Sequence, residues 1–305
     1  MYRMLDINGT QLAYYEWEVP NCRGVVQISH GMAEYLERYQ GLAAFLNEQG
    51  FTVVGADHRG HGHSCPTGEP IGYFGDGVSW NDIVGDLHAV RLYTQKKYVD
   101  KPYFFVGHSM GSLLLRDYLS TFANGLAGAA IIGTADWPKL LGGAGMVLAN
   151  IICAFRPRAT AGLLYNLSIG PYNKGFPQRT GGEWLTRDEA VVDAYIADPL
   201  SGYISTNGLF RELMRGTKRV SQPARFQLPV HLPLYIASGE VDPVGGAAVV
   251  KKVAAAYKQA GQTDQEVHIY PQARHEIFQE INRAEVFADL GAWLQKEVEK
   301  AASAQ

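Results

Sequence analysis

The stretch that most restricts the fold of this chain runs from residue 103 to residue 122. A short apolar segment of the β-strand type, residues 103–106, leads directly into Gly-His-Ser-Met-Gly at residues 107–111. Leucine and aromatic residues then recur at three- and four-residue intervals up to Phe122, which is the spacing of a helix. A strand, a sharp turn and a helix in this order predict that Ser109 has a strained backbone and an exposed side-chain oxygen. An ordinary strand-to-helix turn is the less favoured interpretation.

Strand and helix patterns alternate along much of the chain. The predicted strands are residues 2–7, 10–17, 25–29, 51–56, 103–106, 129–132, 234–238 and 266–270. Asn8 and Gly9 separate the first two strands as a strong hairpin signal. Helical spacing follows most of the later strands, and the last helix is expected from about residue 277 to residue 300. We therefore predict an α/β fold with a mostly parallel central sheet of about eight strands and helices on both faces.

The alternation stops after Gly133. Residues 134–226 contain helical stretches but no pattern of a buried parallel strand. We predict that residues 1–133 and 227–305 form the core, and that residues 134–226 are a helical cap inserted after the sixth strand. The cap is expected to lie over the carboxyl ends of the strands, where open α/β sheets bind ligands.

One helix of the cap is expected to begin at a capping box. Thr186 is followed three residues later by Glu189, the spacing in which two side chains satisfy backbone N–H groups at a helix start. This pattern predicts Thr186 as the N-cap of a helix that continues through Tyr195.

The composition excludes several classes of partner and location. With 30 acidic and 27 basic residues the net charge is −3, so no nucleic-acid-binding surface is expected. Three cysteines, Cys22, Cys65 and Cys153, are too few and too widely spaced for a disulfide framework and fit a reducing compartment. The first residues lack the apolar region of a signal peptide. We therefore expect a cytoplasmic location.

Two further side chains are predicted to meet Ser109. A serine nucleophile needs a base, and the base needs an acid that holds it in one tautomer. Asp242 lies in the loop after the strand at residues 234–238, and His275 lies in the loop after the strand at residues 266–270. The order Ser, Asp, His along the chain is a known one for such triads. We predict these three residues as the catalytic set.

Nearby residues offer rivals for two of these roles. Glu240 is the rival acid, but Gly239 and Pro243 bracket the turn that presents Asp242. His268 is the rival base, yet it lies within a predicted strand and is expected to pack there. His108, inside the turn around the serine, is expected to have a structural role.

The anion that forms on a substrate carbonyl needs two backbone N–H donors. The residue after the nucleophile, Met110, should supply one of them. The loop after the strand at residues 25–29 should supply the other, and we assign it to Met32. The loss of one such donor typically costs roughly 10²–10³ in rate.

Two other motifs resemble sites of a different kind. His58, His61 and His63 follow Asp57 closely enough to suggest a metal site. They lie among glycines with no clear further ligand cluster, so we favour hydrogen bonds that stabilise the loop, and expect no metal. The glycine cluster at residues 142–145 lacks the lysine and hydroxyl residue of a phosphate-binding loop.

Taken together, these motifs resemble one known family. They are His-Gly-Met-Ala-Glu at residues 30–34 with Arg38 and Tyr39, Asp-His-Arg-Gly-His-Gly-His-Ser at residues 57–64, and the segment around Ser109. The chain resembles α/β-hydrolases of the monoacylglycerol lipase and lysophospholipase group, which are also described as serine aminopeptidase-like. The resemblance implies the α/β-hydrolase fold and a serine carboxylic ester hydrolase that needs no cofactor. It implies a monoacylglycerol, a lysophospholipid or a similar small acyl ester as the substrate.

The resemblance also implies residues that bind the substrate. Residues 191–200 resemble the family's cap, where the residue that matches Tyr195 helps to bind glycerol. Glu34 and Arg38 match polar positions near the alcohol end of the pocket. The alternative is that Tyr195 only packs the cap and that Glu34 and Arg38 pair with each other. Met32 is bulkier than the family's usual residue at its position, which bears on the size of the substrate.

The nearly uncharged segment at residues 140–155 has two interpretations. As a buried helix it would line a tunnel for the acyl chain, and this is the interpretation we prefer. An apolar outer face would instead favour peripheral contact with a membrane, as in relatives.

Two other functions are compatible with parts of the sequence. An amidase or aminopeptidase would use the same triad and an acidic group for the amine of the substrate, for which Glu34 and Glu183 are candidates. A small-molecule receptor on a hydrolase scaffold is disfavoured by the intact triad. Dehalogenase and epoxide hydrolase chemistry needs a carboxylate at the position of Ser109.

Overall fold

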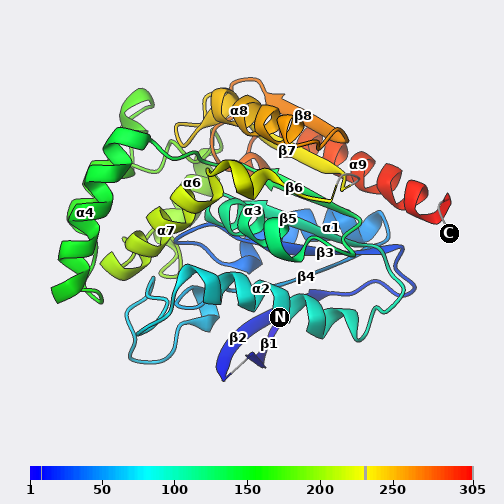
Figure 1. Cartoon of the computed structure of the whole chain (residues 1–305), viewed down its shortest axis with the longest axis horizontal. Helices are drawn as coiled ribbons and strands as arrows, with labels where there is room; N and C mark the ends of the chain where they lie inside the picture. Colours follow the sequence, from blue (N-terminus) through cyan, green and yellow to red (C-terminus); the bar gives the residue numbers. More distant parts are fainter. Residues whose placement is uncertain (8, 230–231, 304–305) are drawn as a thin grey trace.

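A single eight-stranded sheet forms the centre of the computed structural model, which describes residues 1–7, 9–229 and 232–303 (Figure 1). The strands are β1 (Tyr2–Ile7), β2 (Thr10–Trp17), β3 (Gly24–Ser29), β4 (Phe51–Ala56), β5 (Tyr103–His108), β6 (Gly128–Ile132), β7 (Leu234–Gly239) and β8 (Gln265–Tyr270). Their order across the sheet is β1-β2-β4-β3-β5-β6-β7-β8. Only the β1–β2 and β2–β4 pairs of the described strands are antiparallel, so the predicted mostly parallel sheet is confirmed. Asn8, in the predicted hairpin turn, lies outside the described residues.

Helices cover both faces of this sheet. The α-helices are α1 (Gln40–Glu48), α2 (Trp80–Gln95), α3 (Met110–Phe122), α4 (Lys139–Phe155), α5 (Gly162–Ser168), α6 (Glu189–Ala197), α7 (Asn207–Val220), α8 (Gly246–Gln259) and α9 (Arg283–Ser303). Alternate residues of a strand point to opposite faces, and β5 shows the result. Phe104 packs in one cluster with residues of α1 and α9, whereas Phe105 packs in another with residues of α2, α3 and α8.

Helices α4 to α7 lie between β6 and β7 in the chain. Figure 1 shows α4 at one end of the molecule, beyond the sheet. Leu209 and Val220 of α7 join the apolar cluster of α2 and α3, so α7 connects this region to the core. The exact limits of a separate cap at residues 134 and 226 remain a prediction.

The preferred interpretation of residues 140–155 as a buried helix is wrong. The small residues Gly142 and Ala149 face inward, where a Cβ on Gly142 would press against the Trp137 ring. Several large residues of α4 point outward, and Leu140, Leu141 and Phe155 are 91%, 80% and 82% exposed, whereas Leu148 and Ile152 pack inward. Small inner side chains allow close packing, so much of the apolar bulk of the helix is left on its outer side. Within the described residues, no helix combines the length and the apolar character needed to span a bilayer.

The predicted start of α6 is also wrong. The helix begins at Glu189, and its N-cap is Asp188, whose side chain accepts a hydrogen bond from the Val191 N–H. Thr186 instead donates to the main-chain oxygen of Gln279 at 3.0 Å. This contact with a distant loop competes with the local capping pattern, and Asp188 takes the capping role.

The last helix starts later than the periodicity predicts. A short 3₁₀ turn (Ile277–Gln279) comes first, and α9 begins only at Arg283. The intervening Glu280 has a fully buried side chain that accepts hydrogen bonds from Arg187 Nε and from the Arg274 N–H, both at 2.8 Å. This buried ion pair holds the segment in a loop conformation that helical spacing does not reveal.

Gly111 provides a test of the packing between α3 and β3. A Cβ added to Gly111 would overlap the carbonyl groups of Ser29 and His30. We expect Gly111→Ala to lower the free energy of unfolding by about 3 kcal/mol, because backbone atoms cannot move aside as side chains do. Urea denaturation followed by circular dichroism measures this change.

Gly85 in the middle of α2 is the matched control, since a Cβ there meets no atom within 4 Å. Gly85→Ala should stabilise the protein by about 0.5–1 kcal/mol through helix propensity. Equal effects of the two substitutions would contradict the proposed close approach.

Candidate active site

Ser109 lies at the junction of β5 and α3 in a strained conformation, as predicted. Its φ is 53° and its ψ is −121°, a region that residues other than glycine rarely occupy. Its N–H donates to the main-chain oxygen of Ile132 at 3.0 Å, and its own carbonyl accepts hydrogen bonds from Ser112 and Leu113. Strain of this kind costs roughly 1–3 kcal/mol and occurs mostly at functional sites. The side chain is partly exposed.

The loop that follows β3 is packed against Ser109. A Cβ added to Gly31 would lie 3.2 Å from the Cβ of Ser109. Met32 follows immediately, and its N–H has no hydrogen-bond partner among the described residues. Met110 is the first residue of α3, and an N–H in the first turn of a helix has no partner within the helix. Two backbone donors are thus available close to the strained serine.

Asp242 and His275 form a buried hydrogen-bonded pair. The Nδ1 of His275 is 3.0 Å from Oδ2 of Asp242, and both residues are almost fully buried. Ser238 Oγ and the Val244 N–H also donate to this carboxylate, each at 2.9 Å. Burial alone would raise the pKa of Asp242, but His275 and the other two donors lower it below its ordinary value. The carboxylate is therefore ionised and fixed in orientation.

The rivals for these roles make different contacts. Glu240 is exposed and accepts a hydrogen bond from the Gln272 N–H at 3.0 Å. His268 stacks on Tyr235 with ring centroids 4.6 Å apart. Neither side chain contributes to the pair formed by Asp242 and His275.

The end of β6 connects Ser109 with His275. Ser109 donates its N–H to Ile132, the last residue of that strand. The next residue is Gly133, and a Cβ there would lie 3.3 Å from Cε1 of the His275 ring. Ser109 and His275 thus both lie beside Ile132 and Gly133 at the sheet edge, and no hydrogen bond between the Ser109 hydroxyl and the His275 ring forms among the described residues.

Trp184 covers His275 from the segment between β6 and β7. The two ring centroids are 5.1 Å apart, and the Trp184 carbonyl accepts the His275 N–H at 3.4 Å. The Glu276 N–H donates to Leu185 at 2.7 Å. The contact of Trp184 with His275 is not predicted from the sequence, because an isolated tryptophan in a region of irregular helices has no local pattern that would distinguish it.

Glu34, Arg38 and Tyr195 lie together, and each is already engaged. Glu34 accepts hydrogen bonds from the Gly31 N–H at 2.6 Å and from Arg38 at 2.7 Å. Arg38 lies 4.7 Å from the centroid of the Tyr195 ring, and the Tyr195 hydroxyl donates to the Ala33 carbonyl at 3.1 Å. That these three residues bind a substrate stays a prediction, because their contacts within the protein already explain their positions.

The histidines of residues 57–64 make hydrogen bonds that stabilise the loop. His58 Nε2 contacts Ser29 Oγ at 3.2 Å, and the His58 N–H donates to His30 Nε2 at 2.9 Å. Burial lowers the pKa of His61 to about 3, so its ring is neutral. Over the described ranges, histidine, cysteine, aspartate and glutamate side chains form no group of three or more that could hold a metal ion.

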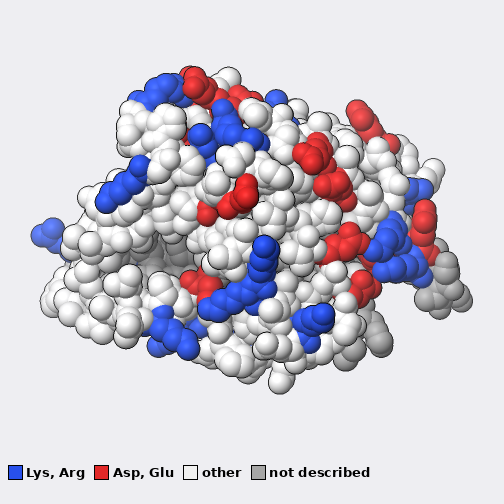
Figure 2. All heavy atoms as spheres, turned by 90° about the horizontal axis from the view of Figure 1, so that it is seen from above, with Lys and Arg blue, Asp and Glu red and all other residues white. Residues whose placement is uncertain are grey.

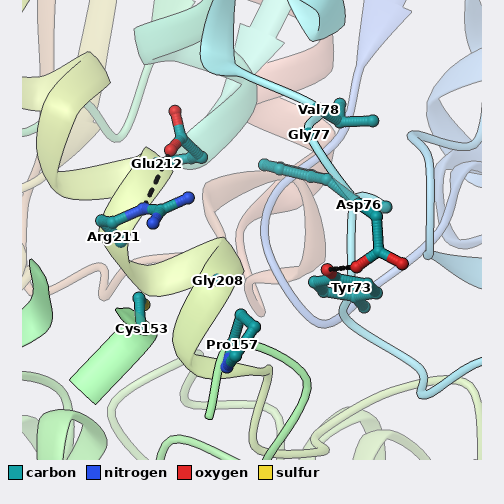
Figure 3. Close-up of a pocket in the computed structure, with 11 residues that line it drawn as sticks. Tyr73, Asp76, Gly77, Val78, Cys153, Pro157, Gly208, Arg211 and Glu212 are labelled. Atoms are coloured by element: carbon teal, nitrogen blue, oxygen red, sulfur yellow. Dashed lines mark hydrogen bonds and ion pairs between the residues drawn. The ribbon is translucent and has the colours of Figure 1, made fainter. Parts of the chain in front are cut away.

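A cavity of about 170 Å³ lies between the loop at residues 73–78 and helices α4 and α7. Tyr73 and Asp76 line one side of it, and Arg211 and Glu212 line the other (Figure 3). Ser109, Asp242 and His275 are not among the residues that line it. This cavity is therefore separate from the predicted catalytic set.

The fold and the strained serine define the class of protein, which is that of the α/β-hydrolases. The chain superposes with a TM-score of 0.89 on a carboxyl esterase from Bacillus coagulans in complex with glycerol, at 27% identity over 97% of this chain and 99% of that one. The profile of the family described as serine aminopeptidase, S33, matches residues 20–282. The chain belongs to this family, as the resemblance predicted.

Two relatives in sequence are named for the same kind of lipase. The chain is 27% identical to a monoacylglycerol lipase of Mycolicibacterium smegmatis over 94% of each sequence. It is 26% identical to the human monoglyceride lipase over 99% of this chain and 92% of that protein. Both relatives match along nearly the whole chain, including the segment between β6 and β7.

The Asp242–His275 pair provides a test of the site. We expect Asp242→Asn to slow the hydrolysis of p-nitrophenyl butyrate by about 10³–10⁴-fold, because the amide favours the wrong tautomer of His275. Steady-state kinetics measure this change, and thermal unfolding reports whether the variant is folded. Glu240→Gln is the matched control, with activity within about twofold of wild type. A large loss in the control and a small one in Asp242→Asn would reverse the assignment of the acid.

Proposed function

We propose that this chain hydrolyses monoacylglycerols and similar monoacyl esters through Ser109, Asp242 and His275. The observation that carries the proposal is the buried hydrogen bond between Asp242 and His275, located at the same sheet edge as the strained Ser109. Ester hydrolysis is also the activity for which the similar lipases and the similar esterase are named.

The mechanism follows from the roles of these groups. His275 Nε2 takes the proton of the Ser109 hydroxyl as Oγ attacks the ester carbonyl, and Asp242 stabilises the imidazolium that forms. The backbone N–H groups of Met32 and Met110 stabilise the negative oxygen of the tetrahedral intermediate. When the intermediate collapses, the ester C–O bond breaks and the alcohol leaves with the proton from His275. Water, deprotonated by His275, then attacks the acyl-enzyme and releases the fatty acid and free Ser109.

The surroundings of Met32 support a site for an acyl chain. Its side chain packs against an apolar cluster formed by Ala149 of α4, Ala161, Leu164 of α5 and Phe210 of α7. A chain of methylene groups gains roughly 0.8 kcal/mol for each group that it buries in such surroundings. We infer that an acyl substituent on the carbonyl carbon held at Ser109 lies on the side of this cluster.

The similarity of the cap supports binding of the alcohol near Tyr195. Relatives named for monoacylglycerol or monoglyceride, and a similar structure with glycerol bound, point to glycerol as the leaving group. An amidase or receptor function gains no such support. Glu183, a candidate for holding an amine, is nearly buried and accepts hydrogen bonds from Thr180, Gly181 and Asn173.

Ser109→Ala is the direct test of the nucleophile. We expect turnover of 1-monoacylglycerol and labelling by a fluorophosphonate probe to fall by about 10⁴-fold or more, with the thermal unfolding temperature nearly unchanged. Ser120→Ala on the same helix is the matched control and should retain activity. Activity that persists in Ser109→Ala would place the nucleophile elsewhere. A substrate panel with lysophosphatidylcholine and an aminoacyl-p-nitroanilide compares the proposed ester substrates with the amide.

We also propose that the outer face of α4 and α5 contacts lipid surfaces. Leu140, Leu141 and Phe155 of α4 and Leu163 and Leu167 of α5 are exposed. The end of the molecule where α4 lies is mostly uncharged, as seen at the left of Figure 2. Exposed apolar side chains that gather on one end of a molecule are typical of surfaces that bind membranes or proteins.

Substitution of these leucines tests the membrane contact. We expect Leu140→Ser combined with Leu141→Ser to weaken sedimentation with phosphatidylcholine vesicles by about tenfold or more, since each leucine contributes up to roughly 1.5–3 kcal/mol when buried. Hydrolysis of soluble p-nitrophenyl butyrate should be unchanged. Leu92→Ser, at an exposed leucine on α2 away from this face, is the control. Equal vesicle binding by wild type and the double variant would refute this contact.

A further inference from the structure

Four ionisable side chains form a buried cluster beside His275. They are Glu34, Arg38, His108 and Glu276, and the two carboxylates and His108 are each less than 5% exposed. Arg38 makes a bidentate ion pair with Glu276, with both N–O distances 2.7 Å, and a further hydrogen bond of 2.7 Å to Glu34. Glu34 Oε1 is 3.2 Å from Nδ1 of His108. These contacts join the loop after β3, the turn around the serine and the loop of His275.

The charges of this cluster require a second cation. Two carboxylates face one guanidinium, and a buried carboxylate without a cation is strongly unfavourable. The other groups around Glu34 do not supply a positive charge. Burial lowers the pKa of His30 to about 4, so its ring is neutral, and burial raises the pKa values of Tyr39 and Tyr195, so their hydroxyls keep their protons. His275 is already paired with Asp242. His108 is the remaining basic group in contact with Glu34.

The hydrogen bonds of the His108 ring lead to the same conclusion. Its Nε2 lies 3.2 Å from the main-chain oxygen of His275, which only accepts hydrogen bonds. Its Nδ1 faces Glu34 Oε1 and the Tyr39 hydroxyl oxygen, and the Tyr39 proton is already donated to Glu34 at 2.8 Å. Both ring nitrogens therefore face acceptors. Only the imidazolium form has a donor on each nitrogen.

We propose that His108 is a positioning residue, kept as an imidazolium by Glu34, that holds the main-chain carbonyl of His275 and thereby orients the catalytic base. This inference rests on the role of His275 in the proposed function. A hydrogen bond from a charged donor is roughly twice as strong as one between neutral groups. The Arg38–Glu276 ion pair restrains Glu276, which follows His275 in the chain. The loop is therefore held at two consecutive residues. Glu34 and Arg38 thus act on catalysis through this loop.

The protonation state is measured in the unmodified protein. Nitrogen-15 NMR of histidine-labelled protein at about pH 7 should show a signal of the His108 ring with a proton on both ring nitrogens. That signal should be absent in His108→Gln. In Glu34→Gln, which keeps the size of the side chain, it should change to that of a neutral ring. A neutral His108 in the wild-type protein would overturn the proposal, whether or not His108→Gln folds.

Kinetics measure the positioning role. We expect His108→Gln to lower kcat by about 10- to 100-fold with KM for p-nitrophenyl butyrate nearly unchanged. In Glu34→Gln the pKa of His108 should fall, so the ratio of its kcat to that of wild type should decrease from about pH 6 to about pH 8. A pH-independent ratio, or a fully active His108→Gln, would overturn the proposal.

His88→Gln is the matched control for these measurements. His88 lies half-buried on α2, where its ring stacks on Phe122, and the variant should keep wild-type kinetics. Ser109→Ala distinguishes a failure of the proposed function from a failure of the positioning role of His108. If Ser109→Ala remains active, the proposed function fails while the NMR result for His108 still stands. If Ser109→Ala is inactive and His108→Gln is fully active, only the positioning role fails.

Discussion

The whole site depends on how closely the start of α3 approaches the end of β3. Gly107 and Gly111 flank Ser109, and a Cβ on Gly111 would overlap the carbonyl of Ser29. Because β3 and β5 pair in parallel with Ser29 opposite Gly107, the loop after β3 emerges directly beside the serine. The strained φ of Ser109 is the cost of turning the chain within this space. Without side chains at the two glycines, the turn can form and the Gly31–Met32 peptide can reach the serine.

A second close approach of two backbones occurs where Asp242 and His275 meet. A Cβ on Gly239, at the end of β7, would overlap the carbonyls of Ala273 and Arg274 in the loop after β8. The parallel pairing of β7 with β8 brings these two loops to one edge, and the missing side chain lets them touch. Two close backbone approaches, on either side of β6, thus bring together groups that are far apart in the sequence.

Sequence patterns predicted the elements that local chemistry determines, and they failed where distant contacts prevail. The strands, their parallel arrangement and the sharp turn at Ser109 follow from periodicity and from the positions of glycines. The start of α6 did not, since Thr186 bonds to Gln279. The late start of α9 did not follow from these patterns either, since Glu280 forms an ion pair with Arg187. The outward face of α4 was the less favoured of two interpretations, because a helix that is apolar on all sides has no periodicity that distinguishes its inner face.

The contacts of His275 also tie the segment between β6 and β7 to the loop after β8. The main-chain oxygens of Glu183, Trp184 and Leu185 accept hydrogen bonds from three consecutive residues of the catalytic loop, Arg274, His275 and Glu276. Residues 183–185 are therefore bound directly to the loop of His275. Helix α4 has an exposed outer face and packs inward through Ala149, Leu148 and Ile152. A displacement of residues 183–185 would therefore break three hydrogen bonds that hold the loop of His275.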